Sequence, residues 1–290
     1  METFMKNKHS LPDWLFQTIT WSRESYNPGD SDFTTTSLLK PARIYALEKL
    51  HKDEIEEEVS DNFASFFGDC IHSACESALI DNDRYIVEER FYRLIEVDGR
   101  MFKIGGQIDL FDGKTKELSD HKFTSVAKLM FGDKADYESQ LAINRWLLRG
   151  KGYEVNSLKI NLFLKDWRKG ESKKNPEYPP IPFVELSFPL WQDVTVEDFI
   201  RQQIHEKESA LRGFHTTCTE EERWTRPTKW ALMKKGQKRA VKLYDNEAEA
   251  TDTVGKGQYV EFRPGEDIRC DSYCSVNQFC DYYINKSNVF

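Results

Sequence analysis

The sequence of 290 residues predicts an α/β fold in which helices flank a mixed β-sheet. After about residue 85, segments that read as strands alternate with segments that read as helices. One strand pair is explicit in residues 104–123, where two partly apolar runs flank the turn signal Asp112-Gly113. With 39% apolar residues, the chain can bury a substantial core, as one large domain with an appendage or as two small domains.

Composition and charge narrow the class of protein. The formal net charge of −8 argues against a uniformly basic surface but allows a local basic track on an acidic body. No window approaches about eighteen uncharged apolar residues, and the N-terminus has no apolar signal core. We therefore expect a soluble cytoplasmic protein that does not bind membranes. Its six cysteines are expected to be reduced and, where clustered, to hold a metal rather than form disulfides.

Residues 1–60 are expected to form an arm and helices that precede the core. Residues 1–35 contain a turn-rich segment and indicate an arm or cap, whose function the sequence does not reveal. Residues 36–59 predict a helix with a hydroxyl cap and an apolar stripe. The stripe consists of Leu39, Ile44, Leu47 and Leu50. The acidic run 53–58 is interpreted as a solvated helix face without a function.

A second helix is expected over residues 61–80. Gly68 is expected to permit close approach of a neighbouring backbone. His72 follows one turn later and Glu76 one turn after that, on the same face. A single helix histidine is more often structural than a metal ligand, so His72 gains meaning only from the acidic residues that follow it. Cys70 and Cys75 are expected to be small core residues.

Charged residues gather on the two strands of the expected hairpin. Asp109 lies on the first strand, and Asp120, His121 and Lys122 lie on the second. Because strand side chains alternate between faces, Asp120 and Lys122 point to one side, and Asp109 can face Asp120 across the pair. Two carboxylates beside an ammonium indicate a site for Mg²⁺ or Mn²⁺. The alternative is a solvated hairpin whose charges pair by chance.

The remaining core elements continue the alternation of strands and helices. Strands are expected over residues 88–97, 158–164 and 183–188, and helices over residues 135–149 and 196–211. In the first of these helices, Gln140 and Asn144 share a face. These two residues are either an exposed polar stripe, or they contact a DNA phosphate or orient the lysine at the edge of the site.

Residues 223–242 form a basic island that contains eight Lys or Arg and no Asp or Glu. Cations that neutralise phosphates, interleaved with tryptophans that stack on bases, suit a nucleic-acid strand. A lysine-rich surface hairpin with buried tryptophans explains the pattern equally well. The residues expected to contact DNA are Arg223, Trp224, Arg226, Lys229, Trp230, Lys234, Lys235, Lys238 and Arg239.

Three cysteines cluster near the C-terminus, namely Cys270, Cys274 and Cys280. Thiolates at such short spacing are typical of zinc and iron–sulfur sites. A fourth ligand has to come from elsewhere in the chain. Cys218 is the best candidate and His215 is a further possibility. The alternative is that the three thiols bind nothing.

Taken in chain order, these motifs resemble those of the PD-(D/E)XK nuclease superfamily. The order is Gly68-x-x-x-His72, Asp109, Asp120-x-Lys122, Gln140 and then the C-terminal cysteines. Within the superfamily, the chain is most similar to RecB-type exonucleases, including the CRISPR-adaptation and AddB-like branch, and to RecB-family exonucleases of phages. The catalytic resemblance covers residues 60–165, and the cysteines extend it to the C-terminus.

The resemblance implies a fold, an activity and partners. It implies a restriction-endonuclease-like core in residues 61–212, a helical arm in residues 1–60 and a basic and cysteine-cluster region in residues 213–290. The implied activity is metal-dependent exonuclease cleavage of linear DNA, single- or double-stranded, in recombination, repair or phage DNA processing. A recombination or annealing protein is a candidate partner, and the host cytoplasm is the implied location if a phage encodes the chain.

The resemblance also implies roles for single residues. The catalytic Mg²⁺ or Mn²⁺ would be held by His72, Asp109, Asp120 and the backbone carbonyl of His121. Lys122 would orient the attacking water and stabilise the transition state, with Gln140 at the edge of the site. Glu76 would orient His72 without itself binding the metal. A structural [4Fe-4S] cluster or Zn²⁺ would be held by Cys270, Cys274 and Cys280, and we expect Cys218 to supply the fourth ligand in place of the family's first cysteine.

The chain departs from the family pattern at several positions. Ile108 stands where the motif's name has proline, Asp120 replaces the commoner glutamate, and Asn144 stands where a tyrosine is frequent. Iron–sulfur members usually carry their first cysteine upstream of the histidine helix, where this chain has Lys40-Pro41. A cluster therefore requires a replacement ligand. The other functions considered are a catalytically silent DNA-binding or recombination-partner module and a site-specific endonuclease.

Overall fold

The computed structural model describes residues 5–25, 27–132, 134–214 and 217–287. The chain divides into two compact units. Unit 1 comprises Met1–Lys40 and Glu56–Arg212, and unit 2 comprises Pro41–Ile55 and Gly213–Phe290. Residue 212 is the last residue of unit 1 and also of the expected core. Residues 41–55, which were expected to be part of the N-terminal region, belong with the C-terminal residues in unit 2.

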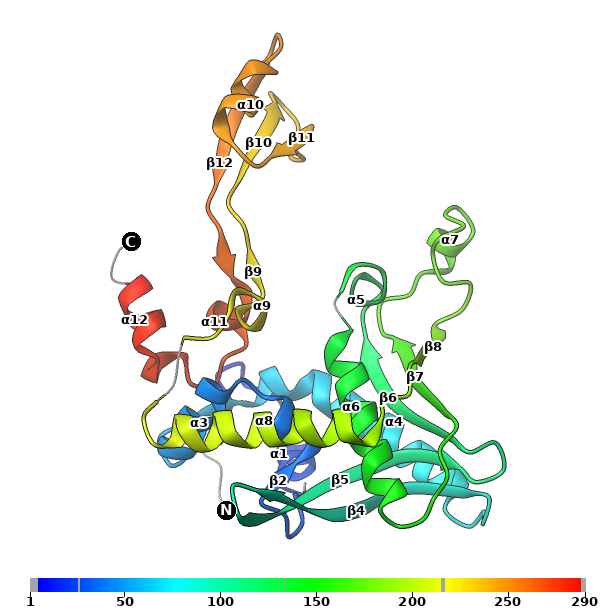
Figure 1. Cartoon of the computed structure of the whole chain (residues 1–290). Helices are drawn as coiled ribbons and strands as arrows, with labels where there is room; N and C mark the ends of the chain where they lie inside the picture. Colours follow the sequence, from blue (N-terminus) through cyan, green and yellow to red (C-terminus); the bar gives the residue numbers. More distant parts are fainter. Residues whose placement is uncertain (1–4, 26, 133, 215–216, 288–290) are drawn as a thin grey trace. The chain divides into compact units, whose positions relative to one another are not determined.

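Unit 1 is built on a mixed sheet with the strand order β2-β5-β6-β7-β8, in which β4 also pairs with β5 (Figure 1). The strands are β2 (Phe33–Thr34), β4 (Tyr85–Val97), β5 (Arg100–Asp112), β6 (Glu117–Thr124), β7 (Ser157–Leu164) and β8 (Phe183–Phe188). β2 runs parallel to β5 and β6 runs parallel to β7, while the other pairs are antiparallel. The mixed α/β class that the sequence predicts is therefore confirmed.

Helices cover both faces of this sheet. α6 (Ala135–Arg149) contacts the face that carries Asp120, whereas α4 (Phe63–Leu79) contacts the face that carries His121 and Phe123. α6 packs a fully buried stripe onto the strands because its apolar residues recur at helical spacing. That stripe consists of Leu141, Ile143, Leu147 and Leu148. Shorter elements of unit 1 are β1 (Met5–Lys6), β3 (Glu57–Glu58), the 3-10 turn Val59–Asn62, α5 (Val126–Phe131) and α7 (Lys169–Ser172).

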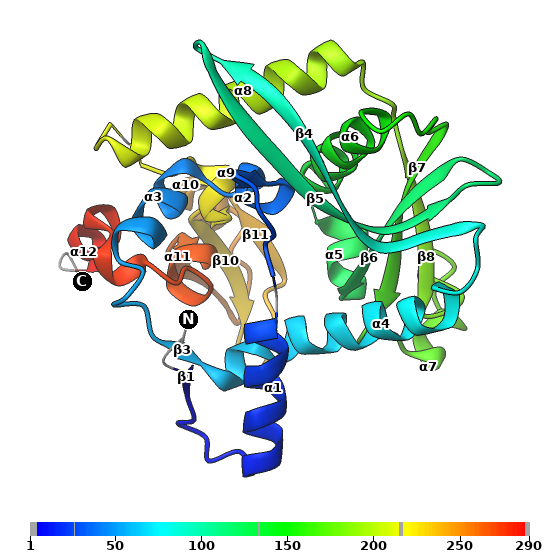
Figure 2. The same cartoon turned by 90° about the horizontal axis from the view of Figure 1, so that it is seen from below.

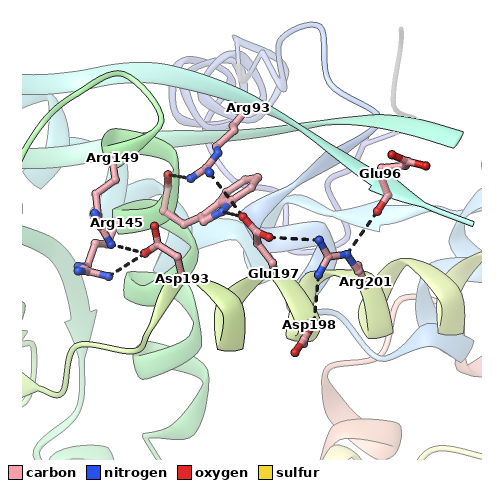
Figure 3. Close-up of polar contacts among 9 residues, drawn as sticks. Arg93, Glu96, Arg145, Arg149, Asp193, Glu197, Asp198 and Arg201 are labelled. Atoms are coloured by element: carbon pink, nitrogen blue, oxygen red, sulfur yellow. Dashed lines mark hydrogen bonds and ion pairs between the residues drawn. The ribbon is translucent and has the colours of Figure 1, made fainter. Parts of the chain in front are cut away.

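A long helix, α8 (Asp193–Leu211), holds α6 and β4 in place through ion pairs and hydrogen bonds (Figure 3). Arg93 of β4 donates to the carbonyl of Trp146 at 3.0 Å and to Glu197 of α8 at 3.4 Å. The Trp146 indole also donates to Glu197, at 3.1 Å. Further along, Arg145 pairs with Asp193 at the start of α8. These contacts hold α6, the helix that faces the candidate site, in a fixed position.

The helix expected over residues 36–59 is instead two short helices separated by Pro41. α2 (Thr35–Leu39) belongs to unit 1 and α3 (Ala42–Leu50) belongs to unit 2. Proline cannot continue a helix, because it lacks the N–H and clashes with the preceding turn. The acidic run 53–58 was expected to be a helix face, and that prediction is wrong. It forms a turn and strand β3, where Glu57 pairs with Arg23.

The N-terminal arm expected in residues 1–35 contains a helix that the sequence analysis did not predict. α1 (Asp13–Ser25) packs on α4 through the fully buried Ile19. Ser22 of α1 donates to Asp69 of α4 at 2.5 Å. Residues 33–34 then add β2 to the edge of the main sheet beside β5. The arm is therefore part of unit 1.

Unit 2 combines α3 with a small sheet and short C-terminal helices. Its elements are α3, α9 (Glu220–Arg223), β9 (Thr225–Arg226), β10 (Lys229–Lys234), β11 (Lys242–Tyr244), α10 (Glu247–Asp252), β12 (Gln258–Arg263), β13 (Glu266–Asp267), α11 (Ile268–Ser272), a 3-10 turn at Asn277–Phe279 and α12 (Asp281–Ser287). β10 is the central strand between β11 and β12, and β9 pairs with β13. In one core of this unit, Ile44 and Leu47 of α3 pack against Val276 and Cys280. None of the helices in the described residues is long and apolar enough to span a lipid bilayer.

A buried carboxylate, Asp267, ties the C-terminal segments of unit 2 together. It accepts hydrogen bonds from Thr225 at 2.6 Å, Lys286 at 2.7 Å and Tyr282 at 2.8 Å. Burial alone would raise the pKa of Asp267, but these hydrogen bonds outweigh burial and hold the pKa below its usual range. Arg223 also pairs with this carboxylate, at 3.3 Å.

We predict that Asp267→Asn destabilises unit 2 by about 1–3 kcal/mol at pH 7, because charged donors lose their partner. The folded pKa is lower than the unfolded pKa, so the carboxylate stabilises the fold above about pH 4 and this contribution is lost as the pH falls further. Urea denaturation at several pH values measures the difference. The difference in unfolding free energy between wild type and Asp267→Asn should narrow below pH 4. The control variant Glu266→Gln, at an exposed neighbouring residue, should have little effect on stability. A gap that stays constant with pH would contradict the prediction.

Candidate functional site

The candidate site lies where strands β5 and β6 separate. The two strands pair only through Leu110–Asp112 and Glu117–Ser119, and the next positions in register are Asp109 and Asp120. The side chain of Asp109 accepts a hydrogen bond from the backbone N–H of His121 at 2.7 Å. In a regular antiparallel ladder, this N–H would donate to a backbone carbonyl instead. On the same edge of β5, β2 pairs with residues 104–105, and the pairing with β6 begins at residue 110. The residues between these two pairings therefore face an opening.

A third carboxylate, Glu88 of β4, joins the two aspartates. Glu88 lies between the pairs Val87–Leu110 and Glu89–Ile108, which places it opposite Asp109. Its backbone has a φ of 49°, a left-handed conformation that non-glycine residues seldom adopt. Glu88, Asp109 and Asp120 consequently form a row across β4, β5 and β6. The sequence analysis missed Glu88.

His72 of α4 reaches this row from the neighbouring helix. Its Nδ1 lies 2.6 Å from Glu88 Oε1 and 3.8 Å from Asp109 Oδ2. Burial alone would lower the pKa of His72, but Glu88, Asp109 and Asp120 raise it to about 9. Without a cation the imidazole therefore holds a proton at neutral pH. A metal at this position would have to displace that proton.

When all three are ionised, the carboxylates of this row carry more negative charge than His72 and Lys122 neutralise. Burial raises the pKa of Asp109, and the charge of Asp120 raises it further, to about 8 despite the opposing effects of His72 and Lys122. A divalent cation between these oxygens would remove the repulsion. Among the described residues, the ligand atoms of one group of three lie within 4.8 Å of one another, and that group is His72, Glu88 and Asp109.

Asp120 and Lys122 form an ion pair beside this group. Lys122 Nζ lies 2.5 Å from Asp120 Oδ2, and Gln140 of α6 donates to Asp120 Oδ1 at 2.5 Å. Burial would lower the pKa of Lys122, but Asp120 and Asp109 raise it above its usual value. The lysine is therefore a cation in this site rather than a base. The residues expected from the sequence to share a face, Asp120 and Lys122, do so.

These residues line one cleft of about 510 Å³ in unit 1. Its walls come from α1, α2, α4, α6 and strands β4 to β6. Gln107 donates to Glu88 at 2.7 Å and accepts from Arg90 at 2.9 Å, which extends the polar network along the cleft. His72, Glu76, Asp109, Asp120, Lys122 and Gln140, all expected to be catalytic, line the cleft.

Other expectations about this region change. Glu76 lines the cleft, but Glu88 is the carboxylate that contacts His72. Asn144 is 2% exposed and accepts from Thr35 at 2.9 Å, so the interpretation as an exposed stripe is wrong for this residue. Gly106 permits the close packing here, because a Cβ would lie 2.6 Å from Thr35 and 2.8 Å from Asn144.

The helix α4 also differs from the expectation in two respects. A Cβ on Gly68 would meet no atom within 4 Å, so close backbone approach does not explain this glycine. Cys70 is exposed and Cys75 is partly buried, so neither is a core residue. The ring of His121 points to the α4 side, 5.8 Å from the ring of His72. Whether its backbone carbonyl binds metal stays a prediction.

The predicted cysteine ligands gather in unit 2. Cys218, Cys270, Cys274 and Cys280 line one cavity of about 20 Å³, which is room for one water-sized group. Burial, with smaller effects from neighbouring charges, raises the pKa of Cys218 to about 12 and that of Cys270 to about 11, so a metal would displace protons from these thiols. His215, the other candidate ligand, lies outside the described residues.

Cations surround this cavity and suit a group held by thiolates. Arg43 donates to Cys280 Sγ at 3.2 Å, and Arg223 and Arg269 also line the cavity. The small cavity fits a single ion. In the described chain, however, no three of these thiol sulfurs lie within 4.8 Å of one another. The sulfur ligands of a single ion would lie closer together than these do. The geometry thus leaves both zinc and an iron–sulfur cluster open.

The basic island contains two kinds of residue. Arg223 and Trp230 are engaged within the unit, since Arg223 pairs with Asp267 and lies over Tyr282, and Trp230 packs beside Leu232. Trp224 is 47% exposed and stacks under Arg269. Arg226 pairs with Glu266 and Lys229 with Asp245. The exposed cations gather at the end of β10 and in the turn that follows it, namely Lys234, Lys235, Lys238 and Arg239.

Comparisons with known proteins add little to this description. No protein-family model matches the chain, and no curated protein matches it. Among solved structures, the chain is similar to one described as the crystal structure of SSO0001. The two share 19% sequence identity with a TM-score of 0.48, and the match covers 67% of this chain and 85% of the other.

We predict that Glu88→Gln weakens Mn²⁺ binding by about tenfold or more, because it removes one charged oxygen from the group around His72. Isothermal titration with MnCl₂ measures the affinity. Glu89→Gln is a matched control, since Glu89 is the next residue and is exposed. Equal affinities in the two variants would show that Glu88 does not bind the ion.

Proposed function

We propose that this chain is a divalent-metal-dependent deoxyribonuclease that hydrolyses phosphodiester bonds and acts as an exonuclease. The observation that carries this proposal is the pairing of two features in one cleft: the His72–Glu88–Asp109 group and the Asp120–Lys122 ion pair. A hard cation and a fixed ammonium are together suited to a phosphate whose negative charge increases during reaction.

The residues of the cleft divide the work between binding the ion and stabilising charge. His72, Glu88 and Asp109 would hold Mg²⁺ or Mn²⁺, with Asp120 beside them. When bound, such an ion neutralises phosphate charge and lowers the pKa of water. This donor set fits that ion, because Asp109 is buried and its ionised form is repelled by Asp120 unless a cation is present. Gln140 fixes the orientation of Asp120 through its 2.5 Å hydrogen bond.

Lys122 would act on the reacting phosphate. In hydrolysis, the water oxygen forms a bond to phosphorus, the bond from phosphorus to the leaving oxygen breaks, and that oxygen gains a proton. The pKa of Lys122 is raised, so its ammonium can orient the water and stabilise the charge that develops. It is not suited to remove a proton from the water. Asp120 holds the ammonium in position through the ion pair.

DNA is the proposed substrate, and its free ends are the proposed point of attack. The exposed cations Lys234, Lys235, Lys238 and Arg239 in unit 2 supply a surface that suits phosphates. No motif in the sequence indicates a module for recognising a particular base sequence, which favours exonuclease over site-specific endonuclease cleavage. We propose recombination, repair or phage DNA processing as the setting, in the cytoplasm, with a recombination or annealing protein as a candidate partner.

We predict that the purified protein degrades end-labelled linear DNA with Mg²⁺ or Mn²⁺ and not with EDTA. Asp120→Ala and Lys122→Ala should each lower the rate by at least about 100-fold, because each removes a charge that acts in the transition state. Circular dichroism checks that the variants fold. Lys114→Ala, at an exposed lysine in the turn between β5 and β6, is the matched control.

The outcomes of this assay separate the candidate functions. Equal cleavage by Asp120→Ala and wild type would remove this site from the mechanism. Cleavage of closed circular DNA would indicate an endonuclease. Retention of DNA in a gel shift without cleavage under either metal would indicate the catalytically silent binding module.

We also propose that Cys218, Cys270, Cys274 and Cys280 hold a structural metal centre, a [4Fe-4S] cluster or Zn²⁺. What supports this is that the four thiols line one cavity with arginines around it. Such a centre would fix the C-terminal segment against α3, whose residues Ile44 and Leu47 line the same cavity. Iron and zinc analysis of the purified protein, together with its visible absorbance, distinguishes the two.

We predict that Cys274→Ala loses the metal and much of its solubility and DNA binding, because one ligand of the centre is missing. Cleavage of short DNA should fall less than DNA binding does, since the catalytic cleft belongs to unit 1. Cys70→Ala, at an exposed cysteine, is the control. A wild-type protein that is stable and metal-free would contradict the centre.

A further inference from the structure

Two tryptophans on α1 are exposed to an unusual degree. Trp14 is 68% exposed and Trp21 is 69% exposed. They are seven positions apart in the helix, which is nearly two full turns, so both lie on one face. Leaving such large apolar surfaces in water is unfavourable, and adjacent exposed aromatics commonly mark a binding surface.

This face of α1 is continuous with the catalytic cleft. Trp21, Ser22 and Ser25 all line the cleft that contains His72 and Asp109. α1 is fixed there, because Ser22 donates to Asp69 of α4 and Ile19 is fully buried. Trp21 lines the cleft, whereas Trp14, about two turns earlier in the helix, does not. Figure 2 shows α1 extending away from α4. A molecule that reacts in the cleft and extends outward would pass along both rings.

The surroundings of the two rings favour unpaired nucleic-acid bases as the occupant. Gln17 and Thr18 lie between the tryptophans on the same face, and both are uncharged and exposed. The Cα positions of the two tryptophans are about 10 Å apart along the helix axis, the length of about three stacked bases. Bases in a duplex already stack on their neighbours, whereas bases of a single strand present open faces to aromatic side chains.

We propose that α1 is a stacking surface for single-stranded DNA, on which Trp21 and Trp14 hold the bases next to the phosphate in the cleft. This inference rests on the proposed nuclease function and specifies its substrate as a single strand. The strand's phosphates would lie toward the cation site, and its bases would lie against α1. The chain therefore binds an unpaired end or a single strand in preference to a fully paired duplex.

Binding of a fluorescein-labelled oligothymidylate longer than about 16 nucleotides tests this directly. The measurement is made with Mn²⁺ in an Asp120→Ala background, so that the probe stays intact. Trp14→Ala and Trp21→Ala should each weaken binding about 5- to 100-fold, and the intrinsic fluorescence of the parent should fall when DNA binds. Trp21→Phe should restore most of the affinity, because a phenyl ring still stacks on a base.

Two controls identify the effect as stacking at the cleft. Phe131→Ala removes an aromatic ring that is 83% exposed but does not line the cleft, and it should leave the affinity unchanged. In the otherwise wild-type chain, Trp14→Ala should raise KM for single-stranded DNA with little change in kcat. Binding of a blunt duplex should be weaker than binding of the single strand and insensitive to Trp14→Ala.

Each remaining outcome overturns the inference. Unchanged affinity in the double variant would show that α1 does not contact the strand, as would absence of oligonucleotide binding by the parent. A dimer that the double variant converts to a monomer would show that the tryptophans serve self-association instead. Failure of the nuclease proposal is seen separately: wild type would then leave DNA uncut while the oligonucleotide still bound in a tryptophan-dependent manner.

Discussion

One hydrogen bond, from the backbone N–H of His121 to the side chain of Asp109, determines the layout of the candidate site. It ends the ladder between β5 and β6 and leaves Asp109 and Asp120 facing each other at the opening. The sheet itself therefore creates the cleft. α4 and α6, on opposite faces, then bring His72 and Gln140 to it.

The same arrangement makes charge the main constraint on this part of the fold. Three carboxylates lie in a row, two of them buried, and among the described residues His72 and Lys122 pair with them. A protein tolerates such repulsion where function requires it, and the left-handed backbone of Glu88 is a second local strain at the same place. Through the contacts of Glu197 with Arg93 and Trp146, α8 holds the sheet and α6 in fixed positions around this strained site.

The sequence predicted most of the core elements and the hairpin residues, because alternation and turn signals are local. It missed Glu88, since two consecutive acids in a strand look like solvent-facing residues and only the strand register places one beside Asp109. It extended one helix through Pro41, although proline was a readable stop signal. The burial of Asn144 depends on Thr35 of a distant segment, which no local pattern reveals.

Unit 2 is assembled from two stretches of chain, and this affects how the protein must be made. α3 leaves the ribosome before residues 56–212, yet the partners of Ile44 and Leu47 lie near residue 280. The apolar side chains of α3 therefore have no packing partner while most of the chain is synthesised. The four cysteines that line the cavity beside α3 are all synthesised later. Completion of this unit is thus a late event in biogenesis. Truncation after residue 212 would leave a helix whose binding partners were never translated.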